Sequence, residues 1–258
     1  MPGRGGWATM PAMPPSSLLR IATYNIHKGV QGVGPARRLE IHNLGLAVEQ
    51  LDADIVCLQE VRKLHHRGPH QFPGWPEQPQ ADYLAPEGYE AVYRTNAVTR
   101  HGEHGNALLS RWPVIGHQHE DISDHRFEQR GLLHVEVDID GLRLHAIVVH
   151  LGLVPGSRVR QVLQLHKFIE REVPAGAPLV VAGDFNDWGL QLKRMLAGFG
   201  LREYEGGEAV PTYPARLPLA QLDHVYARGL TPVGLHVPRG RAWWRMSDHL
   251  PLIAEFRL

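Results

Sequence analysis

The stretch Val180–Trp188, VVAGDFNDW, decides the fold, because an apolar run passes through a glycine directly into carboxylates and an amide. The branched apolar residues at its start predict a buried strand, and Gly183 permits a turn or a close backbone approach. Asp184 and Asn186 are separated by the two-residue period of a strand, so we expect them on one side. Phe185 should then point the other way, into packing.

The same pattern, an apolar run that ends in polar residues, recurs along the chain. The predicted strands are Leu19–Ile26, Ile55–Leu58, Ala107–Leu109, Leu133–Val137, Leu142–Val149, Leu179–Ala182, Val225–Ala227 and Leu252–Phe256. Apolar residues at helical spacing predict a surface helix between Val159 and Val173, and Asp187 and Trp188 should begin another. Strands that alternate with helices indicate an α/β fold of packed layers.

Turn signals refine this arrangement. Asp140-Gly141 lies between two alternating segments and predicts a hairpin, so the sheets are mixed rather than purely parallel. The stretch 62–87 is dense in Pro, Gly and His and has no periodicity, which is typical of a functional or mobile loop. Without repeats or a linker, residues 18–258 are predicted to form a single catalytic domain, and residues 1–17 a disordered tail.

Composition excludes several classes of protein. The chain has 258 residues and 43% hydrophobic content, and its 27 basic residues balance 27 acidic ones. A net charge of +0 argues against a tight, sequence-blind nucleic-acid binder, although it leaves a local basic groove open. Cys57 is the only cysteine and lies in an apolar run, so we expect a core residue and no disulfide. No segment has the length and apolarity of a transmembrane span or signal peptide, so we expect a cytoplasmic monomer.

Polar residues at the ends of the predicted strands form a coherent set. These are Asn25, His27, Gln59, Glu60, His150, Asp184, Asn186, Asp223, His224, Asp248 and His249. A single polar residue at a strand end is usually solvated or bonded to a turn. Several carboxylates that converge with amides and imidazoles repel one another unless a cation lies among them, and oxygen ligands without cysteine suit Mg²⁺ or Mn²⁺ better than zinc.

The motifs that carry these residues resemble those of the endonuclease/exonuclease/phosphatase superfamily. They are Thr23–Gly29, Leu58–Glu60, Gly105–Ser110, His150–Gly152, Gly183–Asn186, Leu222–His224 and Ser247–Pro251. They occur in that family's order and span nearly the whole chain after Leu18. The resemblance implies a four-layer sandwich, in which two mixed β-sheets pack face to face with helices outside. It also implies metal-dependent hydrolysis of a phosphate ester at one end of the sheets.

The resemblance also implies a metal site. Glu60 resembles the principal metal ligand of the family, Asn25 lies beside it in the motif pattern, and Asp248 is expected close enough to contribute. The implied cofactor is Mg²⁺ or Mn²⁺, which neutralises charge on the phosphate and on the leaving oxygen.

The other matched positions resemble the residues that move protons and hold the phosphate. Asp184 resembles the acid that orients or deprotonates the attacking water, and Asn186 the amide that holds that water or a phosphate oxygen. His249 resembles the family histidine, and Asp223 the carboxylate that fixes its tautomer. His150 would face the phosphate from the other side, as a phosphate stabiliser or a general acid.

Two departures bear on the substrate. His150 stands where the abasic-site DNA repair branch typically has tyrosine, and resembles deoxyribonuclease, sphingomyelinases and inositol-phosphate phosphatases. His27 stands where the repair enzymes usually carry an acid. We therefore expect a phosphodiesterase or phosphatase, with a phospholipid or inositol-type phosphate as substrate. The alternatives are a Mg²⁺-dependent nuclease acting on DNA or RNA and, less favoured, a non-catalytic binding scaffold.

A second group of features is separate from these motifs. Trp243 and Trp244 precede Asp248 and are flanked by Arg239, Arg241 and Arg245, so they either pack on the sheet edge or form a platform for substrate. Paired histidines at 65/66, 101/104 and 117/119 lack companion cysteines, so solvated imidazoles are expected there rather than a zinc site. The arginines at 130, 158 and 160 are expected to form surface ion pairs.

Overall fold

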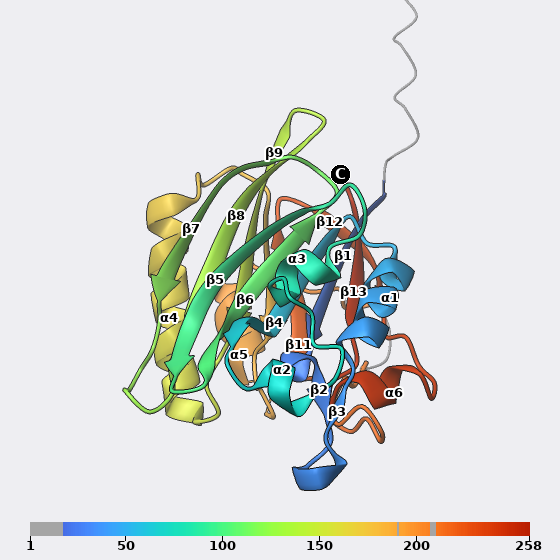
Figure 1. The fold of residues 1–258 in the computed structure, drawn as a ribbon. Helices are drawn as coiled ribbons and strands as arrows, with labels where there is room; N and C mark the ends of the chain where they lie inside the picture. The colour runs from blue at the N-terminus through green and yellow to red at the C-terminus, as the bar shows by residue number, and fades with distance from the viewer. Residues whose placement is uncertain (1–17, 190, 207–209) are drawn as a thin grey trace, which may run out of the picture.

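The computed structural model describes residues 18–189, 191–206 and 210–258, and the predicted tail at residues 1–17 lies outside this part. Two mixed β-sheets of six and five strands pack face to face, with helices on both outer faces (Figure 1). This arrangement confirms the predicted four-layer α/β sandwich. The chain end at Leu258 lies at the top of Figure 1, and the strands that carry the predicted site residues end at the bottom.

The six-stranded sheet has the order β12-β13-β1-β4-β6-β5. Its strands are β1 (Leu18–Asn25), β4 (Ile55–His65), β5 (Glu90–Thr99), β6 (Gly102–Ser110), β12 (Thr231–His236) and β13 (Leu252–Arg257). Only β1 and β4 pair in parallel, and the other neighbours are antiparallel. Asn25 at the end of β1 is opposite Gln59 on the parallel strand β4, so it lies beside Glu60, and β4 continues five residues further to His65.

The five-stranded sheet has the order β11-β10-β9-β8-β7. Its strands are β7 (Val114–Asp121), β8 (Gly131–Ile139), β9 (Leu142–His150), β10 (Leu179–Asp184) and β11 (Asp223–Arg228). The β8–β9 connection is the predicted hairpin: Asp140 and Gly141 have φ values of 51° and 88°, as a tight turn with both central residues left-handed requires. The parallel pair β9–β10 brings His150 and Asp184 to one edge.

Helices cover both sheets. On the six-stranded sheet, apolar residues of α1 (Ile41–Leu51), α3 (Gln80–Leu84) and α6 (Trp243–Met246) share one buried cluster with β1 and β4. On the five-stranded sheet, α4 (Pro155–Glu172) and α5 (Gln191–Gly198) pack against β9 and β10. The remaining elements are α2 (Gly68–Gln71), the 3₁₀ turns η1 (His27–Gly29) and η2 (Gly34–Ala36), and the small ribbon β2 (Val30–Gln31) and β3 (Arg38–Leu39).

The main core lies between the two sheets, where alternate residues of each strand interdigitate. Leu133, Val135 and Val137 of β8 point into it and are fully buried. Burial of each such side chain contributes about 1.5–3 kcal/mol to folding. Cys57 belongs to this core as predicted, and burial raises the pKa of its thiol to about 12, so it is not a reactive thiol.

Five strands and part of one loop differ from the prediction. The short strands β2 and β3 and the longer strands β5, β7 and β12 were not expected. β5 and β7 are polar and half-exposed edge strands, and β12 contains Pro232 and Gly234, so their apolar patterns are weak. The stretch 62–87 is not one loop, because β4 continues to His65 and is followed by α2 and α3. Among the described residues, no helix is long and apolar enough to cross a membrane.

Candidate active site

The register of the five-stranded sheet places three predicted site residues in one row. Asp184 at the end of β10 is opposite His150 on β9 and opposite Asp223 on β11. All three are buried: the exposed fraction is 8% for His150, 1% for Asp184 and 0% for Asp223. Backbone pairing therefore sets their spacing without the help of any loop.

His249 closes this row from the loop before β13. Its Nδ1 donates to Asp223 Oδ2 at 2.8 Å, and its Nε2 lies 3.6 Å from Asp184 Oδ2. Burial alone would lower the pKa of His249, but Asp223 and Asp184 outweigh it and raise the pKa to about 10. The imidazole therefore carries a positive charge at neutral pH, and the hydrogen bond to Asp223 holds it in one orientation.

His150 lies on the other side of Asp184, with Nε2 3.6 Å from Asp184 Oδ2. Burial, together with nearby Arg130, lowers the pKa of His150 to about 4. Arg130 itself donates to Glu128 Oε1 and to the Leu151 carbonyl, so its guanidinium is held by the protein. Asp184 thus faces one charged and one neutral imidazole, a difference that the sequence did not disclose.

The predicted metal-binding residues come from adjacent strands of the other sheet. Asn25 ends β1, Glu60 lies on β4, and Asp248 precedes β13. Asn25 Nδ2 donates to Asp184 Oδ2 at 3.1 Å, which joins the two sets of residues across the sandwich. The site therefore spans the junction of the two sheets.

Side chains of η1 contact both carboxylates of this set. Lys28 Nζ lies 2.5 Å from Glu60 Oε2, and His27 Nδ1 lies 3.1 Å from Asp248 Oδ1. Burial would raise the pKa of Glu60, but Lys28 outweighs burial and holds that pKa well below its usual range. For Asp248, too, burial opposes the shift, and the His27 hydrogen bond lowers the pKa. Both groups are therefore ionised and available to a cation.

These donors fit a divalent cation. Carboxylate and amide oxygens are the ligands that Mg²⁺ and Mn²⁺ prefer, and Asp223 Oδ1 is buried without a hydrogen-bond partner among the described residues. Ligand atoms of Asp184, Asp223 and His249 all lie within 4.8 Å of one another, so this set, predicted to move protons, also has the spacing of a metal-binding group. Among the described residues, His134, Glu136 and His145 form another group with this spacing, away from the predicted site.

The chain leaves β10 differently from the prediction. The strand ends at Asp184, and Asn186 has a left-handed φ of 49°, so strand alternation does not place the two residues. Instead, Asn186 N donates to Asp184 Oδ1 and Asn186 Nδ2 donates to the Leu151 carbonyl, each at 2.9 Å. Phe185 is buried against Tyr226, as expected.

Asp187 and Trp188 lie just before α5 rather than in its first turn. Asp187 Oδ2 accepts a hydrogen bond from Leu192 N at 2.8 Å, so the carboxylate caps the start of this helix. Trp188 is 61% exposed, and its ring meets Tyr213 edge-on. Tyr213 in turn lies 4.9 Å from His249, measured between ring centroids, so an aromatic wall runs from the solvent to the site.

Two of the polar residues at the predicted strand ends, Gln59 and His224, are directed away from the site. The side-chain amide of Gln59 donates to Thr23 Oγ1 and to the Cys57 carbonyl, both within the six-stranded sheet. His224 follows Asp223 in β11 and therefore faces the opposite side, where Glu203 accepts its Nδ1 hydrogen bond at 3.0 Å. Strand alternation separates these residues from their functional neighbours.

Sequence reasoning assigned no role to three residues that touch the site. Lys28 and Ser247 lie within the motifs, and Ser247 Oγ donates to the Asn25 carbonyl at 2.7 Å. Their position in the motifs was the available signal. Tyr213 lies in a long connection without periodicity, so no signal pointed to its contact with His249.

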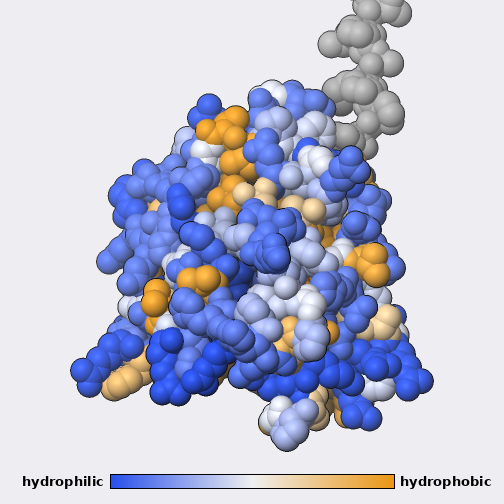
Figure 2. Space-filling view, in the orientation of Figure 1, coloured by the Kyte–Doolittle hydropathy of each residue, from blue (hydrophilic) through white to orange (hydrophobic). Residues whose placement is uncertain are grey.

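Trp243 and Trp244 were expected either to pack on the sheet edge or to form a platform for substrate, and their surroundings differ. Trp243 packs against the buried cluster beneath α6, whereas Trp244 lines an open groove of about 540 Å³. Arg216 lies over the Trp244 ring at 5.2 Å, and the groove reaches Ser247 and Asp248. Figure 2 shows that the lower end of the molecule is covered mainly by hydrophilic residues.

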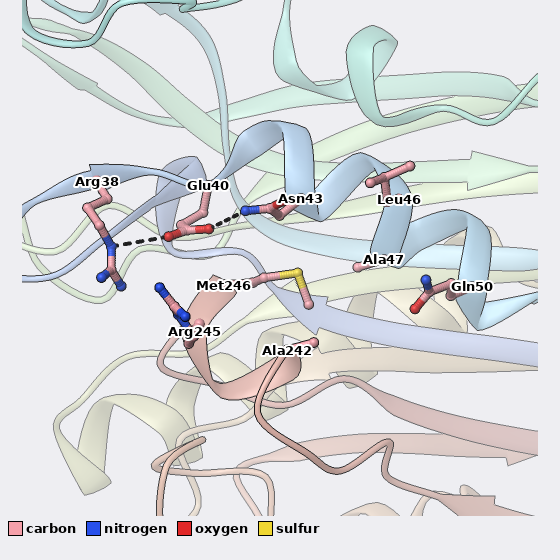
Figure 3. Close-up of a pocket in the computed structure, with 9 residues that line it drawn as sticks. All are labelled: Arg38, Glu40, Asn43, Leu46, Ala47, Gln50, Ala242, Arg245 and Met246. Carbon is pink, nitrogen blue, oxygen red and sulfur yellow. Dashed lines mark hydrogen bonds and ion pairs between the residues drawn. The ribbon is translucent and has the colours of Figure 1, made fainter.

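A separate cavity of about 420 Å³ lies between α1 and α6 (Figure 3). Glu40 bonds both Arg38 and Asn43 at its mouth, and Met246 forms part of its wall. None of the predicted catalytic or metal-binding residues lines it. The predicted catalytic and metal-binding residues therefore lie apart from this cavity.

Comparisons with known proteins agree with this geometry. The family model described as "Endonuclease/Exonuclease/phosphatase family" matches residues 22–249. The uncharacterized protein YbhP of Escherichia coli K12 is 36% identical over 261 residues, which cover 96% of this chain and 100% of YbhP.

Solved structures share the fold. An endonuclease/exonuclease/phosphatase from Beutenbergia cavernae has a TM-score of 0.72 at 24% identity, covering 93% of this chain and 72% of that one. The TDP2 protein of D. rerio, solved with a single strand DNA product, has a TM-score of 0.67 at 16% identity, covering 94% and 100%. With the ordered motifs and the sandwich, the match over residues 22–249 establishes that this chain belongs to the endonuclease/exonuclease/phosphatase family.

Proposed function

We propose that this protein is a divalent-metal-dependent hydrolase of phosphate esters, acting as a phosphodiesterase or phosphatase. The observation that supports this most is the buried row of His150, Asp184 and Asp223, closed by His249. It places a neutral and a cationic imidazole each 3.6 Å from the same carboxylate oxygen of Asp184, the proposed base. Hydrolysis of a phosphate ester needs these groups to activate water and to stabilise negative charge on the phosphate.

Each residue of the row has a role that follows from its charge. Asp184 orients the attacking water and takes its proton. His249 is protonated and donates its Nε2 hydrogen to the phosphate, while Asp223 keeps the ring in place. His150 is neutral near pH 7, so we assign it as a hydrogen-bonding stabiliser of the phosphate rather than as the general acid.

Glu60, Asn25 and Asp248 would hold Mg²⁺ or Mn²⁺. Lys28 contacts the Glu60 carboxylate and His27 contacts that of Asp248. The bound cation supplies charge neutralisation on the phosphate and on the leaving oxygen. Asn25 has a second role, because its amide also donates to Asp184 and so fixes the orientation of that carboxylate.

The site residues themselves provide the first test. Asp184→Asn, Glu60→Gln and His249→Asn should each lower kcat/KM for bis(p-nitrophenyl) phosphate with Mg²⁺ or Mn²⁺ by about 100-fold or more. Asp187→Ala is the matched control, since this buried carboxylate caps α5; it should cost about 1 kcal/mol of stability and keep most activity. Wild-type rates in all three site variants would contradict the assignment, and a wild-type protein that hydrolyses no phosphate ester would indicate the non-catalytic scaffold.

For the substrate, we favour a phospholipid or inositol-type phosphate, mainly because the net charge is +0. His150 resembles the sphingomyelinases and inositol-phosphate phosphatases, but it also resembles deoxyribonuclease. A nuclease is the second candidate. The groove beside Asp248 is lined by Arg38, Arg216, Arg241 and Arg245 together with Trp244, which suits a nucleic-acid strand. The TDP2 neighbour, which was solved with single strand DNA, is consistent with that reading.

Supercoiled plasmid separates the two candidates. Nicking that requires Mg²⁺ and falls steeply with salt would favour the nuclease, because phosphate contacts along a strand release counterions. Hydrolysis of phospholipids or inositol phosphates without plasmid nicking would favour the first candidate.

A further inference from the structure

A second cavity, of about 270 Å³, opens beside the active site between the ends of β4 and β6 and the short helix α2. We call it the β4–β6 cavity. Four of its lining residues are cationic, namely Lys28, Arg37, Arg62 and Arg67, and His65, His101 and His104 add three imidazoles. Because the whole chain has a net charge of +0, this concentration of positive charge is local.

The lining residues include few negative charges to offset these cations. Glu103 is the single acid among those described, and it accepts a hydrogen bond from Thr95 Oγ1 at 3.0 Å. Of the four cations, Lys28 alone forms an ion pair within the described residues, with Glu60. Within the described residues, Arg37, Arg62 and Arg67 therefore line the same cavity without an ion-pair partner.

Two polar atoms of the cavity are buried and have no hydrogen-bond partner among the described residues. These are Arg62 Nη1 and His65 Nδ1. Burial, together with Arg62 and His101, lowers the pKa of His65 to about 4. An anionic ligand would pair with the buried Arg62 donor and offset the repulsion among the cations of the cavity.

Aromatic rings hold the arginines in place. The Arg62 guanidinium lies over Trp75 at 5.8 Å and that of Arg37 over Phe72 at 5.6 Å, and the two rings stack on each other. Stacking fixes the planes of the guanidinium groups while their N–H donors remain free. This is the arrangement that phosphate oxygens recognise.

The cavity lies next to the proposed metal-binding residue Glu60. Lys28 lines the cavity and also contacts Glu60, and Arg62 follows Glu60 by two residues on β4. A substrate whose scissile phosphate lies at the centre would therefore extend a neighbouring group into the cavity. Resting on the proposed function, we propose that the β4–β6 cavity binds a second phosphate group of the substrate, so that bisphosphorylated molecules bind in preference to monophosphorylated ones.

Binding measured without divalent cations tests this inference independently of catalysis. Isothermal titration would compare thymidine 3′,5′-bisphosphate with thymidine 5′-phosphate, and inositol 1,4-bisphosphate with inositol 1-phosphate. In at least one pair, the bisphosphate should bind about 10-fold more tightly, the size expected of one charge-assisted hydrogen bond. The pair that shows the preference identifies a nucleotide or a headgroup as the source of the second phosphate.

Substitutions locate the preference. Arg62→Gln should reduce the Kd ratio to about 2 or less, and Arg67→Gln, an exposed position whose loss spares the fold, should reduce it in the same direction. Lys63→Gln is the matched control: it removes one exposed cation from the adjacent position of β4, outside the cavity lining, and should keep the ratio. The inference is wrong if neither pair shows a preference, or if the preference survives in both arginine variants. Hydrolysis of bis(p-nitrophenyl) phosphate is scored separately, so it bears only on the proposed function.

Discussion

At the scale of single residues, the site is built on unusual backbone. Outside glycine, the described residues with positive φ are His27, Lys28, Asp52, Glu60, Asp140 and Asn186. Asp52 ends α1 and Asp140 turns the β8–β9 hairpin, but the other four surround the active site. Left-handed backbone costs about 1 kcal/mol or more for such residues and persists only where the surrounding structure holds it. Here it aims Glu60 and Asn186 toward the junction of the sheets.

At position 183 the backbone leaves room only for glycine. Its φ is 153°, and a Cβ atom built there would lie 1.9 Å from the Val149 carbonyl oxygen. Gly183→Ala should therefore lower the free energy of unfolding by on the order of 3 kcal/mol or more, as measured by denaturant titration. Gly176→Ala, where a Cβ meets nothing within 4 Å, is the control and should change stability by less than about 1 kcal/mol. Equal effects at both positions would show that close approach of the strands is not the cause.

At the scale of elements, the outer face of β8 and β9 carries a buried pair of histidines. His134 Nε2 and His145 Nδ1 share a hydrogen bond at 2.9 Å, and their rings are stacked beneath α4. Burial and nearby His145 lower the pKa of His134 to about 4, and Glu136 and Glu172 compensate only in part. The folded protein therefore keeps His134 neutral.

This pair predicts a pH dependence of stability. A histidine with a lowered folded pKa contributes stability that is fully present above about pH 6.5 and is lost as the pH falls toward 4. Between pH 7.5 and pH 5, the His134 contribution should fall by about 2 kcal/mol, and His134→Gln should remove that part of the decline. Denaturant unfolding at the two pH values measures it. His70→Gln, at an exposed position of α2, serves as the control. If the stability of His134→Gln fell between the two pH values as steeply as that of the wild type, the assignment would be contradicted.

At the scale of the whole molecule, the site exists only because the two sheets meet. The strands β13, β1 and β4 of one sheet bring the predicted metal-binding residues, and β9, β10 and β11 of the other bring the row of acids and imidazole. Asn25 and His249 cross the junction, through hydrogen bonds to Asp184 and Asp223. Any change in how the sheets pack therefore changes the site.

Asn106 is a second link between the sheets. From β6, its buried Nδ2 donates to the Gly131 and Val148 carbonyls of the opposite sheet, at 3.0 and 3.2 Å. Asn106→Ala should cost on the order of 2 kcal/mol of stability and also lower kcat, because the alignment of Asn25 with Asp184 loosens. Unfolding and steady-state kinetics measure the two effects together. Asn43→Ala removes an exposed amide of α1 and should leave kcat unchanged; a similar loss of kcat in both variants would contradict a role in alignment.

The sequence by itself determined the family, most strands and the polar residues at their ends. Motif order and strand periodicity are local properties, so the hairpin at Asp140, the helix over 155–172 and the core position of Cys57 were predictable. The edge strands were not, because half-exposed strands have weak apolar patterns.

Only the tertiary structure decided which of the collected residues meet and how they are charged. Alternation along a strand separates Asp223 from His224 by face, and the register sets Asp184 between His150 and Asp223. The opposite pKa shifts of His150 and His249 depend on burial and on carboxylates distant in the chain. The β4–β6 cavity likewise brings together arginines from separate segments. The charge and burial at a site depend on all its neighbours in space, and the order of residues along the chain does not specify those neighbours.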